Sequence, residues 1–345
     1  MLRSVFVMLA VLAFWVSPTS AQDNTLTLIT HDSFNVSEAV LAEFEAQTGI
    51  RVRILPMGDA GAMVNQAILT RQNPLGDVLF GVDNTFLSRA LENDLFESYA
   101  SELLADIPAM FKIDPENRVT PVDYGDVCLN YDIGYFERAG LAVPSSLADL
   151  TKPEYRGLLV AQNPATSSPG LAFLLTTIAE FGTEGDYTYL DFWADLLDND
   201  ALVVDGWTQA YFNYFSQGAE GGTYPMVVSY ASSPPFTINE ETGKPTTASI
   251  TAQGMCFRQI EFAGILRGTE NRRAAELFID FLLSVSFQED MPMQMYVFPV
   301  NPQAALPEIF EKYAEVAENP ALLDPEEIEA GRENWIQAWT ETILR

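Results

Sequence analysis

Short apolar runs alternate with helical patterns along almost the whole chain, and this alternation restricts the fold more than any other feature of the sequence. Residues 26–30 form a β-rich run, and residues 52–55 return to a strand. Between them, Ser37 caps a helical pattern that Gly49 ends. A strand–helix–strand order of this kind predicts α/β layers around a largely parallel sheet.

The rest of the chain repeats the two patterns. We expect further helices near residues 63–68, after Pro169, over 272–283 and after Pro325, and further strands at 76–82, 158–161, 202–204, 226–230 and 297–300. The 345 residues are enough for two domains of roughly 100 to 200 residues each. We expect lobe 1 to comprise residues 22–124 and 262–309, lobe 2 to comprise 125–261, and a helical tail of 310–345 to pack on lobe 2. An inserted lobe leaves two connecting segments and a cleft.

The N-terminus has the layout of a secretory signal peptide. A basic Arg3 precedes an apolar run over residues 5–16, and small residues lead to Ala21, after which we expect cleavage. The apolar run is too short for a membrane span, which needs about 20 residues. The sequence therefore predicts an exported protein.

The charge balance limits the partners. Against 48 acidic residues stand 18 basic ones, a net charge of −30, and removal of Arg3 with the leader makes it −31. Nucleic acids and anionic membranes need basic surfaces and are poor candidates, whereas a cationic ligand or simple solubility fits. A single histidine and two cysteines predict no His-rich or Cys-rich metal site.

The two cysteines lie in strand-like runs. Cys128 belongs to the run 127–131 and Cys256 to the run 255–260. Since free thiols are uncommon in exported proteins, we expect them to pair, with two buried thiols as the alternative.

Two loops at predicted strand ends are candidate ligand contacts, because ligands of open α/β sheets bind there. Asp59, followed by Ala60, either caps a helix or faces a cation. In the loop 163–170, Ser168 is the expected cap and Pro169 the expected first helical residue, so amides and hydroxyls would converge on an anion such as phosphate. An ordinary capped helix is the alternative.

Aromatic residues mark two further strand ends. Trp207 lies where a strand gives way to a helix, either in the core or with its ring offered to a cation. The run 229–234 ends a strand with hydroxyls, and Tyr296 supplies another aromatic face.

Catalytic motifs are weak in this sequence. His31, Asp32 and Ser33 contain the letters of a triad, but we expect neighbours at a strand end not to face one another in triad geometry. The sequence also lacks a nucleophile elbow, a P-loop and a dinucleotide fingerprint, so no catalytic residue and no cofactor is expected.

A set of motifs in this order resembles the periplasmic thiamine-binding proteins of ABC importers, within the two-lobed solute-binding proteins of type II. The resemblance covers almost the whole mature chain and rests on residues 30–34, the loop at Asp59, and residues 81–84, 122–125, 164–170, 206–211, 229–234 and 296–300.

The resemblance implies a site between the lobes. The implied ligand-binding residues are Asp59, Ala60, Ser167, Ser168, Trp207, Tyr230, Ala231, Ser232, Ser233 and Tyr296. Tyr296 stands where the family commonly has Trp, and not every member has the cysteine pair, which would clip the connecting segments together.

The implied function is capture of thiamine, thiamine monophosphate or thiamine diphosphate by a monomeric periplasmic protein that delivers it to a membrane permease. A polyamine or ferric-ion binder of the same fold is the alternative within transport. Polyamine binding would use Asp32, Asp59, Asp83 and Asp123, whereas ferric binders use adjacent tyrosines, which this chain lacks. A thiamine-degrading enzyme is the alternative of another class and would need a free cysteine nucleophile.

Overall fold

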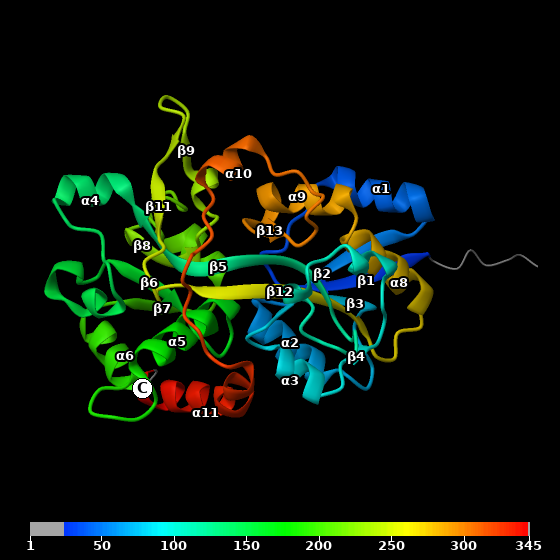
Figure 1. Ribbon diagram of the computed structural model, residues 1–345, viewed down its shortest axis with the longest axis horizontal. Helices are drawn as coiled ribbons and strands as arrows, with labels where there is room; N and C mark the ends of the chain where they lie inside the picture. The colour runs from blue at the N-terminus through cyan, green and yellow to red at the C-terminus, as the bar shows by residue number, and fades with distance from the viewer. Residues whose placement is uncertain (1–23, 344–345) are drawn as a thin grey trace, which may run out of the picture.

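A computed structural model describes residues 24–343 of the protein (Figure 1). The predicted signal peptide and its cleavage site after Ala21 lie outside the described residues. The strands are β1 Thr25–Thr30, β2 Arg51–Pro56, β3 Val78–Asp83, β4 Phe96–Glu97, β5 Thr120–Asp132, β6 Leu159–Gln162, β7 Leu202–Val204, β8 Met226–Tyr230, β9 Ile238–Asn239, β10 Lys244–Pro245, β11 Thr247–Ile250, β12 Phe257–Leu266 and β13 Phe298–Pro299.

The helices follow the predicted pattern. They are α1 Glu38–Thr48, α2 Ala60–Leu69, α3 Leu87–Glu92, α4 Ile133–Ala139, α5 Ser168–Phe181, α6 Tyr189–Asp198, α7 Trp207–Gln209, α8 Arg272–Leu282, α9 Val285–Met295, α10 Glu308–Tyr313 and α11 Pro325–Ile343. A π-helical turn, Ala210–Tyr214, continues α7, and short 3₁₀ turns occupy the connections. Ser37 caps α1 through a 3.3 Å bond from the Val40 amide, and Gly49 ends α1 with φ 71°, as predicted.

One mixed sheet runs through the molecule in the order β2-β1-β3-β12-β5-β8-β6-β7. The pairs of β1 with β2 and β3, and of β6 with β7 and β8, are parallel. The central pairs of β12 with β3 and β5, and of β5 with β8, are antiparallel. A largely parallel sheet was therefore wrong for the centre, and the expectation of mixed strands flanked by helices is confirmed. The reason is that β5 and β12, the two long strands, run past each other in opposite directions.

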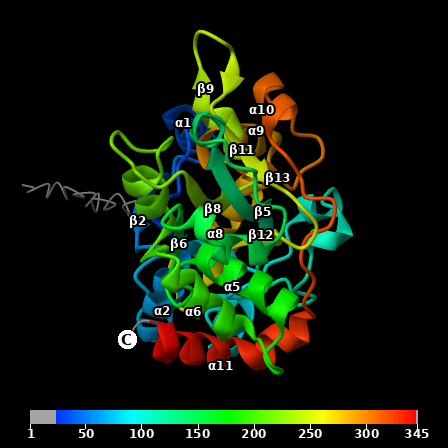
Figure 2. The same ribbon diagram turned by 90° about the vertical axis from the view of Figure 1, so that its left-hand side faces the viewer.

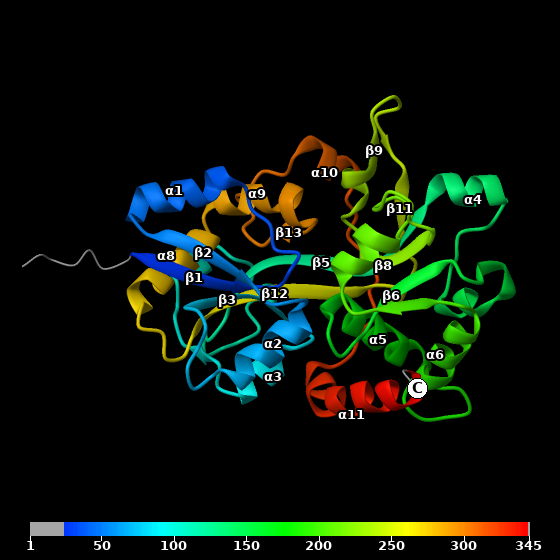
Figure 3. The same cartoon turned by 180° about the vertical axis from the view of Figure 1, so that it is seen from behind.

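Helices lie on both faces of the half of the sheet that contains β1 (Figure 3), and the period-two pattern of β1 divides its side chains between them. Leu26 and Leu28 pack in the same cluster as Phe44 of α1 and the apolar side of α8. Ile29 points to the other face and joins the cluster that contains Met63 of α2. Successive strand residues project to opposite faces, so both faces of this half of the sheet are covered.

The C-terminal helix α11 touches both halves of the molecule (Figures 1 and 2). Trp339 packs edge-on against Trp193 of α6 at 5.3 Å between ring centroids. Arg332, 1% exposed, donates to the Thr85 carbonyl at 3.2 Å and to the Ser88 hydroxyl at 2.6 Å. The tail thus reaches from α6 to the β3–α3 connection, and the lobe boundaries remain a prediction.

The predicted disulfide is confirmed. Cys128 on β5 and Cys256, one residue before β12, are bonded, with their Cα atoms 4.3 Å apart. The bond joins the two strands that run through the centre of the sheet. None of the helices in residues 24–343 is long and apolar enough to cross a membrane.

Candidate ligand-binding site

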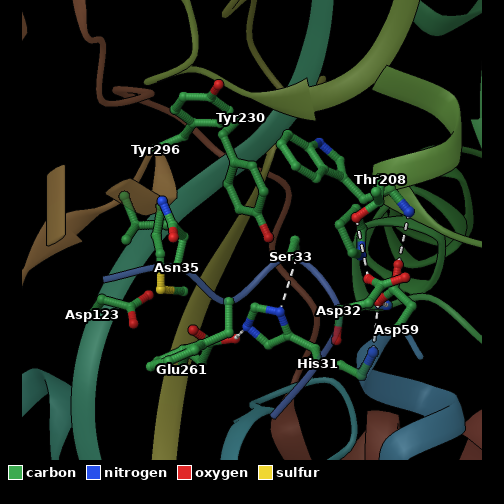
Figure 4. Close-up of a pocket in the computed structure, with 18 of the residues that line it drawn as sticks. His31, Asp32, Ser33, Asn35, Asp59, Asp123, Thr208, Tyr230, Glu261 and Tyr296 are labelled. Atoms are coloured by element: carbon green, nitrogen blue, oxygen red, sulfur yellow. Dashed lines mark hydrogen bonds and ion pairs between the residues drawn. The ribbon is translucent and has the colours of Figure 1, made fainter. Parts of the chain in front are cut away.

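A cavity of about 360 Å³ lies where loops from both halves of the sheet meet over β5 and β12 (Figure 4). The walls comprise the loop after β1 (residues 31–35), the starts of α2 and α5, the α7 segment and residues 294–297. Asp123 and Gly125 of β5, with Gln259 and Glu261 of β12, form what we call the floor. Pockets for small organic molecules have volumes of roughly 300 to 1,000 Å³, so the cavity suits one such ligand.

Asp59 at the start of α2 joins the two sides of the cavity. Its carboxylate accepts the Ala60 amide at 2.6 Å, as a helix cap, and the Trp207 amide at 2.8 Å from the opposite side. The Ser168 amide approaches the same carboxylate at 3.4 Å. Burial raises the pKa of Asp59, and the hydrogen bonds from Trp207 and Ala60 oppose that rise. Asp59 is therefore a helix cap that also lines the cavity, and its contact with a ligand stays a prediction.

The start of α5 differs from the prediction by one residue. Ser167, not Ser168, is the N-cap, and it accepts the Gly170 amide at 3.4 Å, while Pro169 occupies the second helical position. The Ser168 hydroxyl donates a short hydrogen bond to Asp83. Because protein carboxylates already occupy this helix start, its hydroxyl and amide do not point freely at an anion.

Three aromatic rings surround one side of the cavity. Trp207 packs edge-on to Tyr230 at 6.3 Å and to Tyr296 at 5.6 Å between centroids. The Trp207 indole N–H donates to Ser229 at 3.0 Å, which fixes the ring orientation. Tyr296 has φ 64°, a left-handed conformation that is rare for a residue with a side chain. Strain of this kind tends to persist at functional positions.

The hydroxyl run after β8 supports this wall from behind. Ser233 lies 3.0 Å from the Ser229 hydroxyl, and Ser232 donates a short hydrogen bond to the Tyr296 carbonyl. Ala231 packs beside the disulfide. The side chains of this run hold Trp207 and Tyr296 in place instead of lining the cavity.

His31 and Ser33 face one another, contrary to the rule applied to neighbours at a strand end, but Asp32 takes no part, so the three residues are not arranged as a triad. Ser33 Oγ lies 2.9 Å from His31 Nδ1, and His31 Nε2 lies 3.1 Å from Glu261 Oε1. The loop turns back after β1, which brings the two side chains together. Asp32 points elsewhere and accepts the Thr208 hydroxyl at 3.2 Å. Burial lowers the pKa of His31 against the pull of the surrounding carboxylates, so the imidazole is neutral near pH 7.

The floor carries buried carboxyl groups. Asp123 is 2% exposed and Glu261 8% exposed. Burial raises the pKa of Glu261 to about 8 and raises that of Asp123 well above its usual range, with the Glu261 charge adding to the rise. Among the described residues that line the cavity there is no lysine or arginine. The interior is thus built for a cation, a hydrogen-bond donor, or both.

Six of the ten predicted binding residues line the cavity and four lie behind it. The six are Asp59, Ala60, Ser168, Trp207, Tyr230 and Tyr296, and the four are Ser167, Ala231, Ser232 and Ser233. Direct ligand contact stays a prediction for each of them. The predicted set omitted the floor residues Gln259 and Glu261. An acid directly before an apolar run, as Glu261 is before residues 262–266, is a usable signal, because unpaired acids are seldom buried without a purpose.

Within residues 24–343, no group of three or more His, Cys, Asp or Glu side chains is arranged to hold a metal ion. The two cysteines of the sequence are joined to each other, so neither is a free nucleophile.

The chain is similar to known periplasmic binding proteins over most of its length. The thiamine-binding periplasmic protein of Salmonella typhimurium is 28% identical over 325 residues, which cover 93% of this chain and 94% of that protein. A solved periplasmic thiamin binding protein superposes with a TM-score of 0.80 at 26% identity, covering 93% and 96% of the two chains. A ferric binding protein from Campylobacter jejuni, at 18% identity and a TM-score of 0.71 over 92% and 99%, shares the fold. Residues 73–317 match the family described as bacterial extracellular solute-binding protein, and the chain belongs to that family.

Proposed function

We propose that this protein captures thiamine in the periplasm, as a monomer, and delivers it to the permease of an ABC importer. The observation that carries the proposal is the cavity itself, in which Trp207, Tyr230 and Tyr296 form an aromatic side above a floor of Asp123 and Glu261. Thiamine joins a cationic thiazolium to an aminopyrimidine. Aromatic faces attract such a cation, and carboxyl groups accept from the amino group. The predicted signal peptide and the periplasmic relatives support the location.

Contacts across the cavity mouth support capture by closure of the two sides. The Asp59 carboxylate accepts the Trp207 amide at 2.8 Å, and the Ala62 amide donates to the Thr166 carbonyl at 3.1 Å. Thr208 donates to Asp32 at 3.2 Å. These bonds link the start of α2 and the loop after β1 to the opposite wall. We expect these bonds to break when the two sides open to admit a ligand and to form again on closure, as in hinge closure of two-lobed binders.

We expect unphosphorylated thiamine to bind more tightly than its phosphates. A phosphate monoester carries about −1.5 to −2 charges at pH 7 and favours donors or cations. Here the start of α5, the expected phosphate site, donates to Asp59 and Asp83, and the lining offers carboxyl groups instead. Affinity should therefore fall in the order thiamine, monophosphate, diphosphate.

Calorimetric titration of the refolded mature protein tests the function and this order. Refolding is needed to strip ligand retained through purification. Thiamine, its two phosphates, spermidine and ferric citrate should be compared at one pH and ionic strength. Tight binding of thiamine alone supports the proposal. Tighter binding of spermidine or iron would assign the protein to a different cargo, and a preference for the diphosphate would contradict the expected order.

A further inference from the structure

Three carboxyl groups form a row across the centre of the sheet. Glu261 of β12 is the direct register partner of Asp83 on β3 and of Asp123 on β5. Directly paired residues on neighbouring strands project to the same face, so the three side chains lie next to each other. All three are buried, with Asp83 wholly enclosed. We call this arrangement the acid row.

The members of the acid row differ in how their oxygens are satisfied. Asp83 accepts hydrogen bonds from the Thr85 amide at 2.7 Å, the Thr85 hydroxyl at 2.5 Å, the Gln259 amide group at 2.6 Å and the Ser168 hydroxyl. Four donors thus satisfy the Asp83 oxygens. In contrast, Asp123 Oδ2 is buried at the cavity floor and has no hydrogen-bond partner. That oxygen is an acceptor without a donor, buried at the floor on which a ligand would lie; Figure 4 shows Asp123 beside the cavity.

Few groups are available to neutralise the row. His31, from the loop after β1, contacts Glu261, while Asp59 of α2 and the Tyr230 phenol of β8 also face it. Arg258 lies three residues before Glu261 on β12, and its guanidinium is paired with Asp126 at 2.5 Å. Asp32 lies on the same side as His31 and adds negative charge. The His31 contact brings no positive charge, because that imidazole is neutral near pH 7, so no neighbouring cation neutralises the three carboxyl groups.

Adjacent buried carboxyl groups cannot all be ionised, so the row retains a proton. Burial raises the pKa of Glu261 to about 8, and burial followed by the Glu261 charge raises the pKa of Asp123 well above its usual range. These values belong to the pair and not to either residue alone. At pH 7 the Asp123–Glu261 pair thus carries at least one proton.

We propose that the Asp123–Glu261 pair stores a proton in the ligand-free protein, and that a bound cation displaces this proton to solvent. In the exchange the O–H bond breaks, its electron pair stays on the carboxylate, and the proton passes to water or buffer. One positive charge enters the cavity and one leaves it. The inference rests on the proposed function, because it takes thiamine to be the cation.

The proton exchange determines how the affinity for thiamine changes with pH. Below about pH 8 the cation must displace a proton, so affinity rises with pH by up to about tenfold per unit for one displaced proton. Above that pH Glu261 has already lost the proton that the cation would displace, and the affinity levels off. Capture is then weaker in an acidified periplasm and stronger in a neutral one.

Calorimetry with thiamine at pH 7 in buffers of different ionisation enthalpy counts the protons. We expect about one proton released per thiamine bound by the wild-type protein. Glu261→Gln and, separately, Asp123→Asn should release markedly fewer and should flatten the pH dependence of the dissociation constant. Glu180→Gln, which removes an exposed acid from the end of α5, is the matched control and should behave as wild type.

The stored proton can also be detected without a ligand, from the pH dependence of unfolding. Since the folded protein holds this proton more tightly than the unfolded chain, the unfolding constant of the wild-type protein should rise with pH up to about pH 8. Glu261→Gln should lose that contribution. Equal pH dependence in the two proteins would overturn the stored proton even if the variant no longer bound thiamine. Normal thiamine binding with no proton release would overturn the exchange alone, whereas absence of thiamine binding at every pH would contradict the proposed function.

Discussion

Trp207 links the aromatic side of the cavity to its support. The residue is only 6% exposed, packs against Tyr230 and Tyr296, and donates through its indole N–H to Ser229. Trp207 thus lines the cavity with a ring that Ser229 holds in orientation, and its backbone amide is bound by Asp59 from the opposite side.

Trp207→Ala should weaken thiamine binding at least tenfold. The change removes a cation–π contact of about 0.5 to 2 kcal/mol together with apolar contact area. Calorimetric titration measures the loss, and Trp207→Phe should retain part of the affinity. The control is Trp193→Phe, a buried tryptophan of α6 that packs on α11, which should lower stability and leave affinity intact. Unchanged thiamine affinity in a folded Trp207→Ala protein would contradict its place in the site.

Single-residue predictions from the sequence succeeded where a local rule applied. Asp59 was a candidate because it follows a strand and precedes a helix, and it does line the cavity. The cap of α5 was misplaced from Ser167 to Ser168, because two adjacent serines satisfy the same capping preference. The contact between His31 and Ser33 was not predicted, because a local rule does not specify how the chain turns after β1.

At the scale of elements, the sequence predicts where strands and helices alternate but not which strands lie side by side. Each predicted strand depends on its own apolar run, whereas the acid row depends on the register of β3, β5 and β12. Asp83, Asp123 and Glu261 lie far apart in the sequence, and register is decided by long-range pairing. The pocket walls could therefore be predicted in part; of the floor, Asp123 was named only for the polyamine alternative, and Gln259 and Glu261 were not predicted.

The helix α11 is a second element whose role depends on distant contacts. Its buried Arg332 bonds to Thr85 and Ser88 near α3, while Trp339 packs on α6. Arg332→Ala removes hydrogen bonds from a buried charged donor, so the free energy of unfolding should fall by about 2 to 3 kcal/mol. Urea denaturation measures it. Glu329→Gln, an exposed acid of the same helix, should change it by less than about 0.5 kcal/mol, and equal effects would contradict the assigned role.

At the scale of the whole molecule, the disulfide fixes the two strands that cross between the halves. Cys128 and Cys256 lie 128 positions apart, so the bond closes a long loop of the unfolded chain. It also lies beside the segment that carries Ala231, behind the aromatic wall. The bond therefore lies on the two long central strands and not in either wall alone.

Replacing both cysteines by serine should lower the free energy of unfolding by about 2 to 4 kcal/mol, mainly because the unfolded chain regains freedom. Guanidinium denaturation of the double variant against the oxidised wild-type protein measures this change. Wild-type protein treated with reductant serves as a second comparison with the same sequence. Thiol labelling without reductant should modify neither cysteine, and labelling at either position would contradict the bond.

The long strands β5 and β12 carry the floor of the cavity, while its walls come from loops and helix starts. Floor and walls are therefore separable for protein engineering. Exchanging residues 31–35, 206–212 and 294–297 while keeping Asp123 and Glu261 is the rational route to biosensors for other organic cations built on the same scaffold.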